Sequence, residues 1–295
     1  MGFLGKHPRV RGVLRGIRRI VRPVSSLRQQ GRDQVYRNLH LRFKADPLVA
    51  LPEFEGEFVL DVRSDVLKRL LMKGHYEPGV AACCRRFLRP DRDAVDVGAN
   101  VGFYSVLFAK RISPGRRVLA VEPIPEAVAK LKLNLQRNGV TERVLIHEGA
   151  ASDEEGPCDL TTVDGKSEYS TLGRLAHASV ATAVGRAVSV PGICLDALVQ
   201  QRILDPGFLK IDVEGAELKV LRGATRLLEE KRPNILIEVH RYLLEEAGDS
   251  ANQVLEFLRE HGYGLFNPER PDRPPVQKDC FPVLCLPGGR SSHSA

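Results

Sequence analysis

The sequence predicts an α/β protein with a mostly parallel sheet, and two observations support this prediction. From about residue 55 onward, short apolar runs alternate with segments of 9 to 14 residues that have helical periodicity. This alternation is typical of strands joined by right-handed helical crossovers. Hydrophobic residues make up 43% of the 295-residue chain and charged residues 27%, which provides enough apolar side chain for a sizeable core.

Seven strands are expected, each a run of four to six residues in which β-branched or other apolar side chains dominate. In chain order they are Ala94–Val97, Arg117–Val121, Val144–His147, Phe208–Ile211, Asn234–Val239, Tyr263–Phe266 and Phe281–Leu286.

Five helices are expected between these strands, because apolar residues recur there at spacings of three and four. Turn residues end three of them: Gly139 and Gly262 follow two helices, and Pro233 cannot continue a third. The expected helices are Val80–Leu88, Phe103–Arg111, Pro125–Asn138, Glu217–Glu229 and Ala251–His261.

The segment 157–193 departs from this alternation. It is rich in Ser and Thr and contains two further candidate strands, Cys158–Val163 and Val188–Pro191. We expect an inserted hairpin or lid between the third and fourth strands. Candidates for contact with a substrate in this insert are Glu168, Tyr169 and Ser170, and the alternative for these residues is a mobile solvent loop.

Three regions are expected: a basic arm over residues 1–54, the main domain over 55–286, and a polar, disordered tail over 287–295. Within residues 9–24, apolar side chains recur at helical spacing among arginines. We expect an amphipathic helix there that contacts an anionic membrane surface or a partner. The alternatives are a poorly ordered arm or a helix that caps the domain.

The expected cellular compartment is inferred from two features that the sequence does not contain, a membrane-spanning segment and a secretory signal. No apolar run approaches the roughly 20 residues that span a bilayer, and the first ten residues do not have the continuous apolar stretch of a secretory signal. The six cysteines have no zinc-type spacing and are expected to be free thiols. We expect a cytoplasmic protein. Membrane binding by residues 9–24 would place it at the inner face of the membrane.

The net charge of +7 is unevenly distributed. Residues 1–46 hold twelve Lys or Arg and two acids, a net charge of +10, which leaves −3 for the rest of the chain. The basic character therefore belongs to the arm, and a nucleic-acid partner is not expected.

The first strand-to-helix junction contains the segment VDVGANVG at residues 95–102. Glycines permit a tight turn, and N–H groups at a helix start favour an anion. The spacing differs from the G-x-G-x-x-G of a dinucleotide site, and Asp96 would repel a pyrophosphate. A zwitterion fits better, because Asp96 attracts an ammonium group, directly or through water, while backbone N–H groups bind a carboxylate. The methionyl part of S-adenosylmethionine carries both groups.

The next two strand ends supply residues for the rest of that ligand. Glu122 is placed to accept hydrogen bonds from the ribose hydroxyls, and Pro123 offers an apolar face for adenine. Ala151 and Asp153 are expected near the adenine edge, with a turn or capping role as the alternative for Asp153. The expected S-adenosylmethionine contacts are Asp96, Gly98, Ala99, Asn100, Gly102, Glu122, Pro123, Ala151 and Asp153.

A second group of charged residues follows the fourth and fifth strands. Asp212 and Glu214 come directly after the fourth strand, and Glu238 and His240 end the fifth. Because the fourth strand should neighbour the first, Asp212 is expected to face the glycine loop. Glu217, in the first turn of the next helix, is expected to act on the helix dipole rather than in chemistry.

These segments resemble the FkbM family of methyltransferases. The matching pieces are VDVGANVGFYSVLFAK, VLAVEPIPEAVAKLKLNL, KIDVEGAELKVLRGA and PNILIEVH, and the resemblance covers about residues 75–266. It implies a seven-stranded, Rossmann-like class I methyltransferase fold with helices on both faces, and methyl transfer from S-adenosylmethionine, usually to oxygen. It also implies cofactor contacts by Asp96, Gly98, Asn100, Gly102 and Glu122.

Methyl transfer to a hydroxyl benefits from a general base within hydrogen-bond reach. The candidates are Asp212 and His240, with Glu214 and Glu238 as orienting residues; the alternative for His240 is a surface histidine at a strand exit. The favoured prediction includes no metal, but a divalent ion held by Asp212, Glu214 and Glu238 is left open.

The expected function is therefore S-adenosylmethionine-dependent O-methylation of a small-molecule or glycan acceptor: a glycan, a lipid-linked sugar or a secondary metabolite. The alternatives are an RNA ribose methyltransferase and a non-catalytic cofactor-binding scaffold at a membrane. Methylation of a base amino group is not expected, because the segment IDVE at the fourth strand end lacks the prolines and the aromatic residue that would stack a flipped base.

Overall fold

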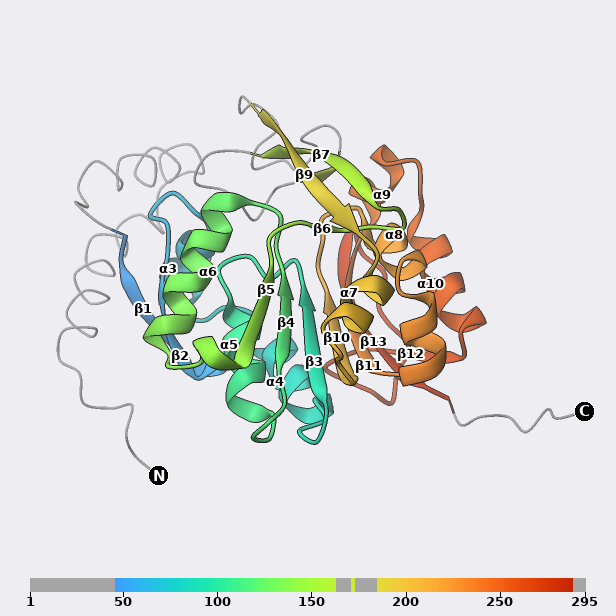
Figure 1. The fold of residues 1–295 in the computed structure, drawn as a ribbon, viewed down its shortest axis with the longest axis horizontal. Helices are drawn as coiled ribbons and strands as arrows, with labels where there is room; N and C mark the ends of the chain where they lie inside the picture. Colours follow the sequence, from blue (N-terminus) through green and yellow to red (C-terminus); the bar gives the residue numbers. More distant parts are fainter. Residues whose placement is uncertain (1–45, 163–170, 173–184, 289–295) are drawn as a thin grey trace, which may run out of the picture.

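The computed structural model describes residues 46–162, 171–172 and 185–288 (Figure 1). Three predictions concern residues outside the described ranges: the amphipathic helix within residues 9–24, the insert residues 168–170 and the tail from residue 289.

A seven-stranded sheet forms the centre of the molecule (Figure 1). Its strands are β3 (Asp93–Val97), β4 (Val118–Val121), β5 (Val144–His147), β10 (Pro206–Ile211), β11 (Asn234–His240), β12 (Tyr263–Phe266) and β13 (Cys280–Pro287). They lie in the order β12-β13-β11-β10-β3-β4-β5. The five strands from β11 to β5 run parallel, and β13 is antiparallel to both of its neighbours. The predicted fold class is confirmed, including the position of the fourth predicted strand, β10, beside the first, β3.

Helices cover both faces of this sheet. They are α3 (Asp65–Lys73), α4 (Pro78–Phe87), α5 (Phe103–Arg111), α6 (Pro125–Arg137), α7 (Leu195–Gln201), α8 (Glu217–Arg222), α9 (Arg241–Glu246) and α10 (Ala251–Glu260). Successive strand residues point to opposite faces. In β4, Val118 and Ala120 pack on the side of α4, α5 and α6, whereas Leu119 and Val121 pack on the side of α7, α8 and α10. Two hydrophobic cores therefore enclose the sheet.

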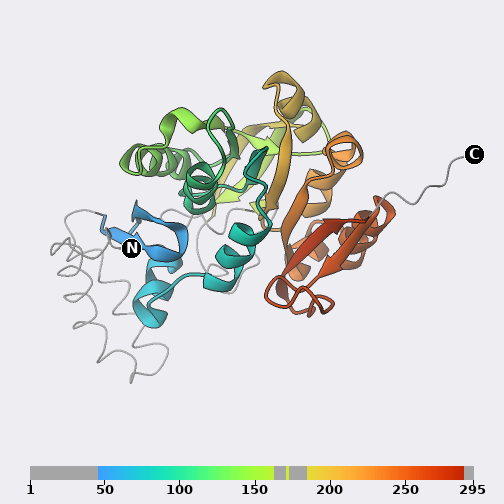
Figure 2. The same ribbon diagram turned by 90° about the horizontal axis from the view of Figure 1, so that it is seen from below.

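A short hairpin precedes the first strand of the large sheet. It consists of β1 (Leu48–Leu51), the 3₁₀ turn η2 (Pro52–Phe54) and β2 (Gly56–Val59), and it was not predicted. Part of it precedes residue 55, at which the predicted domain begins. Figure 2 shows the hairpin beside α5 and α6. Asn134 of α6 fixes β2, because its Oδ1 accepts a hydrogen bond from Val59 N at 2.8 Å and its Nδ2 donates to Val101 O at 2.8 Å.

The insert between β5 and β10 forms a separate small sheet. Its strands lie in the order β6-β9-β7-β8, with bounds Ala150–Ala151, Arg186–Ile193, Gly156–Thr162 and Thr171–Leu172. The two extra strands predicted for this segment are therefore present as β7 and β9. Figure 1 shows this small sheet above the edge where β3, β4 and β10 end. The insert thus lies over the carboxyl edge of the large sheet.

The helix predicted over residues 217–229 is interrupted in the structure. Helix α8 ends at Arg222, and a π-helical turn, η5, follows over Leu227–Lys231. The chain passes so close to the insert that a Cβ on Gly223 would lie 2.0 Å from the backbone oxygen of Ser152. Asp196 then caps the second segment, because its carboxylate accepts hydrogen bonds from the N–H groups of residues 226 and 227 at 2.9 and 2.8 Å. Tertiary contacts that lie far apart in sequence therefore break this helix.

Among the described residues, the longest helix has 13 residues, and none of these helices is long and apolar enough to cross a membrane.

Replacement of Asn134 by Ala should destabilise the fold. It leaves Val59 N–H and Val101 C=O without their side-chain partner, at a cost of about 2–4 kcal/mol in the free energy of unfolding. Urea denaturation monitored by circular dichroism measures this change. Gln136→Ala, an exposed position on the same helix, should stay within about 0.5 kcal/mol of wild type. Equal stability of the two variants would show that Asn134 does not anchor the hairpin.

Candidate active site

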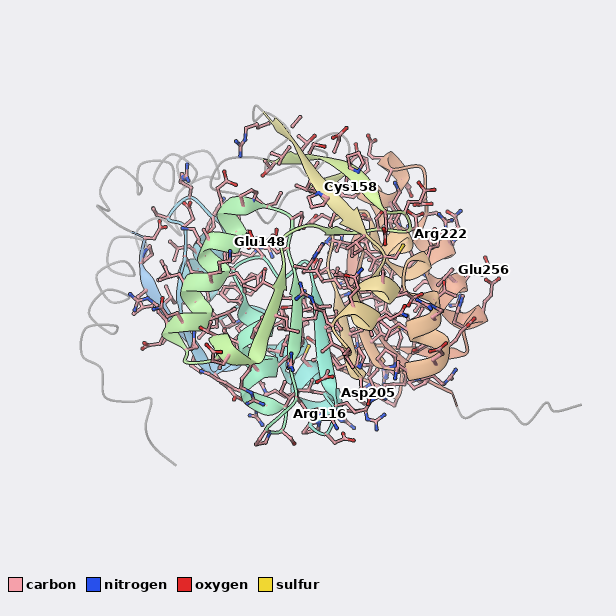
Figure 3. The ribbon with its side chains drawn as sticks, in the orientation of Figure 1. Arg116, Glu148, Cys158, Asp205, Arg222 and Glu256 are labelled. Atoms are coloured by element: carbon pink, nitrogen blue, oxygen red, sulfur yellow. The ribbon has the colours of Figure 1, made fainter. Side chains whose placement is uncertain are left out.

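A cavity opens at the carboxyl edge of the large sheet, beneath the small sheet. Its lining comes from the ends of β3, β4, β10 and β11, from β6 and β7, and from α3 and the segment before α4. Cys158, which Figure 3 labels on β7, lines this cavity. Arg116 and Asp205, labelled in the same figure, mark the opposite edge, where β4 and β10 begin. The cavity therefore lies where ligands bind in open α/β sheets.

The glycine loop after β3 forms one wall of this cavity. Gly98, Asn100 and Gly102 have φ angles of 76°, 46° and 92°, a backbone region that favours glycine. A Cβ on Gly98 would lie 1.8 Å from the backbone oxygen of Asp212, so no larger residue fits there. Gly98 and Asn100 line the cavity, whereas Ala99 and Gly102 are not among the lining residues.

Asp96 lies below the cavity rather than in its wall. It is fully buried, and its Oδ2 accepts a hydrogen bond from Ser105 Oγ at 2.6 Å. Its Oδ1 lies 4.0 Å from Lys210 Nζ and has no hydrogen-bond partner among the described residues. Burial raises the pKa of Asp96, and Lys210 opposes that shift. In this geometry, Asp96 supports the loop from below, and its predicted contact with the methyl donor stays a prediction.

Glu122, at the end of β4, lines the cavity and is 5% exposed. Its Oε2 accepts a hydrogen bond from Asn100 N at 2.7 Å, and its Oε1 accepts one from Ile124 N at 2.9 Å. These two bonds fix the carboxylate and leave each oxygen a further lone pair for a ligand hydroxyl. Burial raises the pKa of Glu122 to about 7, although the two backbone hydrogen bonds oppose it.

The wall that β6 contributes differs in one residue from the prediction. Ala150, Ala151 and Ser152 line the cavity, as does Pro123. Asp153 does not; instead its Oδ1 accepts a hydrogen bond from Ser152 Oγ at 3.2 Å. Ser152 is therefore the polar side chain at this strand end that the sequence analysis missed, because the register of a two-residue strand is not visible in the sequence.

The acidic residues predicted after β10 and β11 do converge with His240. All four line the cavity: Asp212, Glu214, Glu238 and His240. His240 Nε2 lies 3.9 Å from Asp212 Oδ1 and 3.7 Å from Glu214 Oε1. Burial opposes a charge on the imidazole, but Glu214 and Glu217 raise the pKa of His240 well above its ordinary value. His240 is 8% exposed, so the surface alternative for it is wrong.

Glu217 has a role that the sequence analysis missed. Its side chain is fully buried, and its Oε1 lies 2.7 Å from His240 Nδ1. The same oxygen accepts a hydrogen bond from Gly215 N at 3.2 Å. As a carboxylate, Glu217 accepts a hydrogen bond from Nδ1 and thereby directs Nε2 toward the cavity. From its position in the first turn of α8, the sequence analysis inferred only an interaction with the helix dipole. The contact with His240 of β11 is a tertiary contact, which the local sequence does not show.

Lys210 connects the two halves of the site. This buried residue of β10 donates a hydrogen bond to Asp212 Oδ2 at 3.2 Å, and its Nζ lies 4.6 Å above the ring of Tyr104. Burial would lower the pKa of Lys210, but Asp212 and Asp96 outweigh it and raise that pKa. Although burial opposes the shift, Lys210 and His240 hold the pKa of Asp212 below its ordinary value. The feature of the sequence that could have indicated this role is a lysine within an otherwise apolar strand.

The cavity lining includes further titratable groups, Glu77 and Cys280. Glu77 accepts a hydrogen bond from Tyr104 Oη at 2.9 Å, and burial raises its pKa to about 7. Cys280 Sγ donates to Glu238 Oε1 at 2.8 Å, and burial raises the pKa of Glu238. Neither Glu77 nor Cys280 was predicted, because they lie outside the strand-end motifs.

Among the described residues, two groups of three bring potential metal ligands within 4.8 Å of one another. One consists of Asp212, Glu214 and His240, and the other of Glu238, His240 and Cys280. The three-carboxylate set that the sequence analysis left open is not one of them. His240 takes a place in both groups, since it projects between the two strand ends.

Comparisons with known proteins identify the family of this chain. The sequence matches the Methyltransferase FkbM domain over residues 96–265, which is more than half of the chain. It is 31% identical over 209 residues to the 31-O-demethyl-FK506 methyltransferase FkbM of Streptomyces tacrolimicus, a match that covers 62% of this chain and 77% of that protein. It is 28% identical over 171 residues to the hexuronic acid methyltransferase AglP of Haloferax volcanii, covering 56% of this chain and 60% of that protein.

The structure is also similar to that of a methyltransferase FkbM from Methylobacillus flagellatus, with a TM-score of 0.42 and 16% sequence identity. This likeness covers 85% of the present chain and 57% of the other.

Replacement of Lys210 by Met should destabilise the protein by about 3–5 kcal/mol near neutral pH, because it leaves buried carboxylates without their cation. The loss should shrink as the pH falls, because protonation of the buried carboxylates removes the charges that lack a cation. Urea denaturation at pH 5 and pH 8 measures both effects. Lys132→Met, which removes an exposed pair with Glu148, should cost less than about 1 kcal/mol at either pH. A loss that does not depend on pH would contradict the charge-pairing role.

Proposed function

We propose that this chain, which belongs to the FkbM family of S-adenosylmethionine-dependent methyltransferases, transfers the methyl group to a hydroxyl oxygen of a glycan, a lipid-linked sugar or a secondary metabolite. The observation that carries this proposal is the single cavity that joins the glycine loop and Glu122 to the group around His240. One side fits the methyl donor, and the other fits the removal of a proton from the acceptor.

The donor side supports an adenosyl ligand through two features. Glu122 is already oriented by two backbone hydrogen bonds, so the ribose hydroxyls meet a fixed carboxylate. Gly98 and Asn100 bring the backbone to the cavity surface, where N–H groups reach a ligand carboxylate. The sulfonium would then lie near Asp212, which follows the adjacent strand.

The acceptor side supports attack by a hydroxyl. The acceptor oxygen forms a bond to the methyl carbon as the bond between sulfur and that carbon breaks, and the hydroxyl proton passes to the surrounding carboxylates and His240. Asp212 and Glu214 lie within 4 Å of His240 Nε2, so a hydroxyl placed among them meets several proton acceptors. General base assistance of this kind is worth typically 10²–10⁴-fold.

The names of two relatives support the acceptor class. FkbM of Streptomyces tacrolimicus is a 31-O-demethyl-FK506 methyltransferase, and AglP of Haloferax volcanii is a hexuronic acid methyltransferase. We therefore place a polyhydroxylated small molecule or a glycan first among the acceptors of this chain. Incubation of purified protein with candidate extracts and an isotope-labelled methyl donor, followed by mass spectrometry, tests this proposal. Labelled methyl ethers support it, whereas label confined to amines or carbon would overturn it.

Replacement of Glu122 by Ala should abolish measurable binding of S-adenosylmethionine in isothermal titration calorimetry, because no other lining carboxylate is fixed at the end of β4. Glu126→Ala, an exposed acid at the start of α6, is the matched control and should bind as wild type does. Unchanged affinity of the Glu122 variant would remove this residue from the donor site.

Donor affinity should also depend on pH through Glu122. The ribose hydroxyls favour the ionised carboxylate, so donor binding lowers its pKa from about 7, and wild-type affinity should fall as pH drops below about 7. Glu122→Gln should bind more weakly at pH 8 but lose this dependence. Calorimetry between pH 5.5 and 8 checks the prediction, and an identical pH profile for the two proteins would refute it.

Replacement of His240 by Ala should lower kcat by about 10²–10⁴-fold while the affinity for S-adenosylmethionine changes little. The imidazole faces the acceptor side, where Nδ1 lies against Glu217 and Nε2 lies near Asp212 and Glu214. Initial rates with the labelled donor, at saturating donor concentration, measure the effect. His75→Ala, at an exposed position, should keep wild-type rates.

A further inference from the structure

We propose that Asp212, Glu214 and His240 bind a divalent first-row metal ion on the acceptor side of the cavity. The site itself is argued from geometry alone. Its consequence for methyl transfer rests on the proposed function.

The ligand atoms are spaced as one ion requires. His240 Nε2 lies 3.9 Å from Asp212 Oδ1 and 3.7 Å from Glu214 Oε1, and all three ligand atoms lie within 4.8 Å of one another. Two ligand atoms that bind one ion at about 2.0–2.2 Å with a tetrahedral angle are roughly 3.3–3.6 Å apart. The two distances from Nε2 are too long for direct hydrogen bonds and exceed the spacing across an ion by a few tenths of an ångström, and the two carboxylate oxygens lie within 4.8 Å of each other.

The second observation is the carboxylate behind the imidazole. Glu217 is fully buried and lies 2.7 Å from His240 Nδ1, on the side of the ring away from Asp212 and Glu214. A histidine that binds a metal almost always donates its other ring N–H to a carboxylate or a carbonyl. This hydrogen bond keeps a proton on Nδ1, so an ion that displaces the second proton of the imidazolium would bind at Nε2, which faces the two carboxylates.

The backbone holds the ligands on rigid elements. Asp212 and Glu214 flank Val213 directly after β10, in a turn where Glu214 and Gly215 have φ angles of 51° and 101°. A Cβ on Gly215 would lie 2.9 Å from Leu243 Cβ, so the turn is packed against the start of α9. His240 ends the neighbouring strand β11. Ligands on the ends of two paired strands need little reorganisation to meet one ion.

The donor set selects the kind of ion. One imidazole nitrogen and two carboxylate oxygens suit Mn²⁺ or Zn²⁺ better than Mg²⁺, which prefers oxygen ligands and retains its waters. The three protein ligands leave positions for an acceptor oxygen. Asp212 also receives a hydrogen bond from Lys210 at its other oxygen, which orients Oδ1 toward the site.

The ion would change how the acceptor loses its proton. A hydroxyl oxygen bound to the ion becomes more acidic. Its O–H bond would break, the proton would pass to the carboxylate of Glu238 in the same cavity, and the oxygen would form its bond to the methyl carbon as the bond between sulfur and that carbon breaks. His240 acts in this scheme as a ligand, and Glu217 as the residue that positions it.

Equilibrium dialysis of untagged, full-length protein with Mn²⁺, together with the electron paramagnetic resonance signal of free Mn²⁺, tests the site. Wild type should show a single saturable site, and His240→Ala should lose it. Glu217→Gln should weaken binding by roughly 10–100-fold. The controls His75→Ala and Glu229→Gln, at exposed positions, should bind as wild type does. Absence of saturable binding by folded wild type, or unchanged binding by His240→Ala, would overturn the proposal.

A second pair of variants assigns the ligands. Loss of Mn²⁺ binding in Glu214→Gln with retention in Cys280→Ser supports the group of Asp212, Glu214 and His240. The reverse result would overturn it in favour of Glu238, His240 and Cys280. The titration needs neither methyl donor nor acceptor, so its failure overturns the metal site alone. Failure of methyl transfer to every acceptor overturns the proposed function alone.

Discussion

One buried ammonium group, Nζ of Lys210, makes the rest of the site possible. The parallel pairing of β10 and β3 places Lys210 directly beside Asp96, and Asp212 follows two residues later, directly after β10. Without a cation between them, two carboxylates at the centre of the sheet would each raise the pKa of the other and favour the neutral form. Lys210 keeps Asp212 ionised, while the face of Tyr104 shields the ammonium from water. The charge of the cavity therefore depends on one strand register.

Backbone contact sets the distance between the two halves of the cavity. Gly98 lies so close to Asp212 that the space for a Cβ is occupied by the Asp212 carbonyl oxygen. The glycine loop and the acidic turn after β10 are thus in direct contact, and neither can shift without the other. The hydrogen bonds that Asn100 N–H and Ile124 N–H donate to Glu122 fix the far side of the loop in the same way. Under the proposed function, a methyl donor bound in this loop would be held in register with the residues around His240.

The sequence predicted the elements of the large sheet well, because apolar runs and glycine junctions record them directly. Phe103–Arg111, Val144–His147 and Tyr263–Phe266 have the predicted bounds. The hairpin β1–β2 and the break after Arg222 were missed, since contacts distant in sequence, such as those of Asn134 and Gly223, determine them.

The candidate site, like the fold, was predicted from the sequence only in part. Strand-end position predicted the convergence of Asp212, Glu214, Glu238 and His240, but not which side chains each one meets. The local sequence around Glu217 is explained by a helix start, and that around Lys210 by a strand. The role of Glu217 appears only when β11 lies beside it, and the role of Lys210 only when β3 does. Ser152 and Asp153 are adjacent in sequence, and only the register of β6 decides which of them faces the cavity.

The small sheet has an apolar cluster of its own. Among the described residues, Leu160 and Val190 pack in this cluster with Ile124 and Ala127 of the β4–α6 region, separately from the two cores that enclose the large sheet. Cys158 and Leu160 also lie in the cavity wall. Substitutions in the small sheet would therefore change one wall of the cavity while both cores stay intact. Under the proposed function, acceptor choice would diversify through this module faster than the methyl-transfer chemistry.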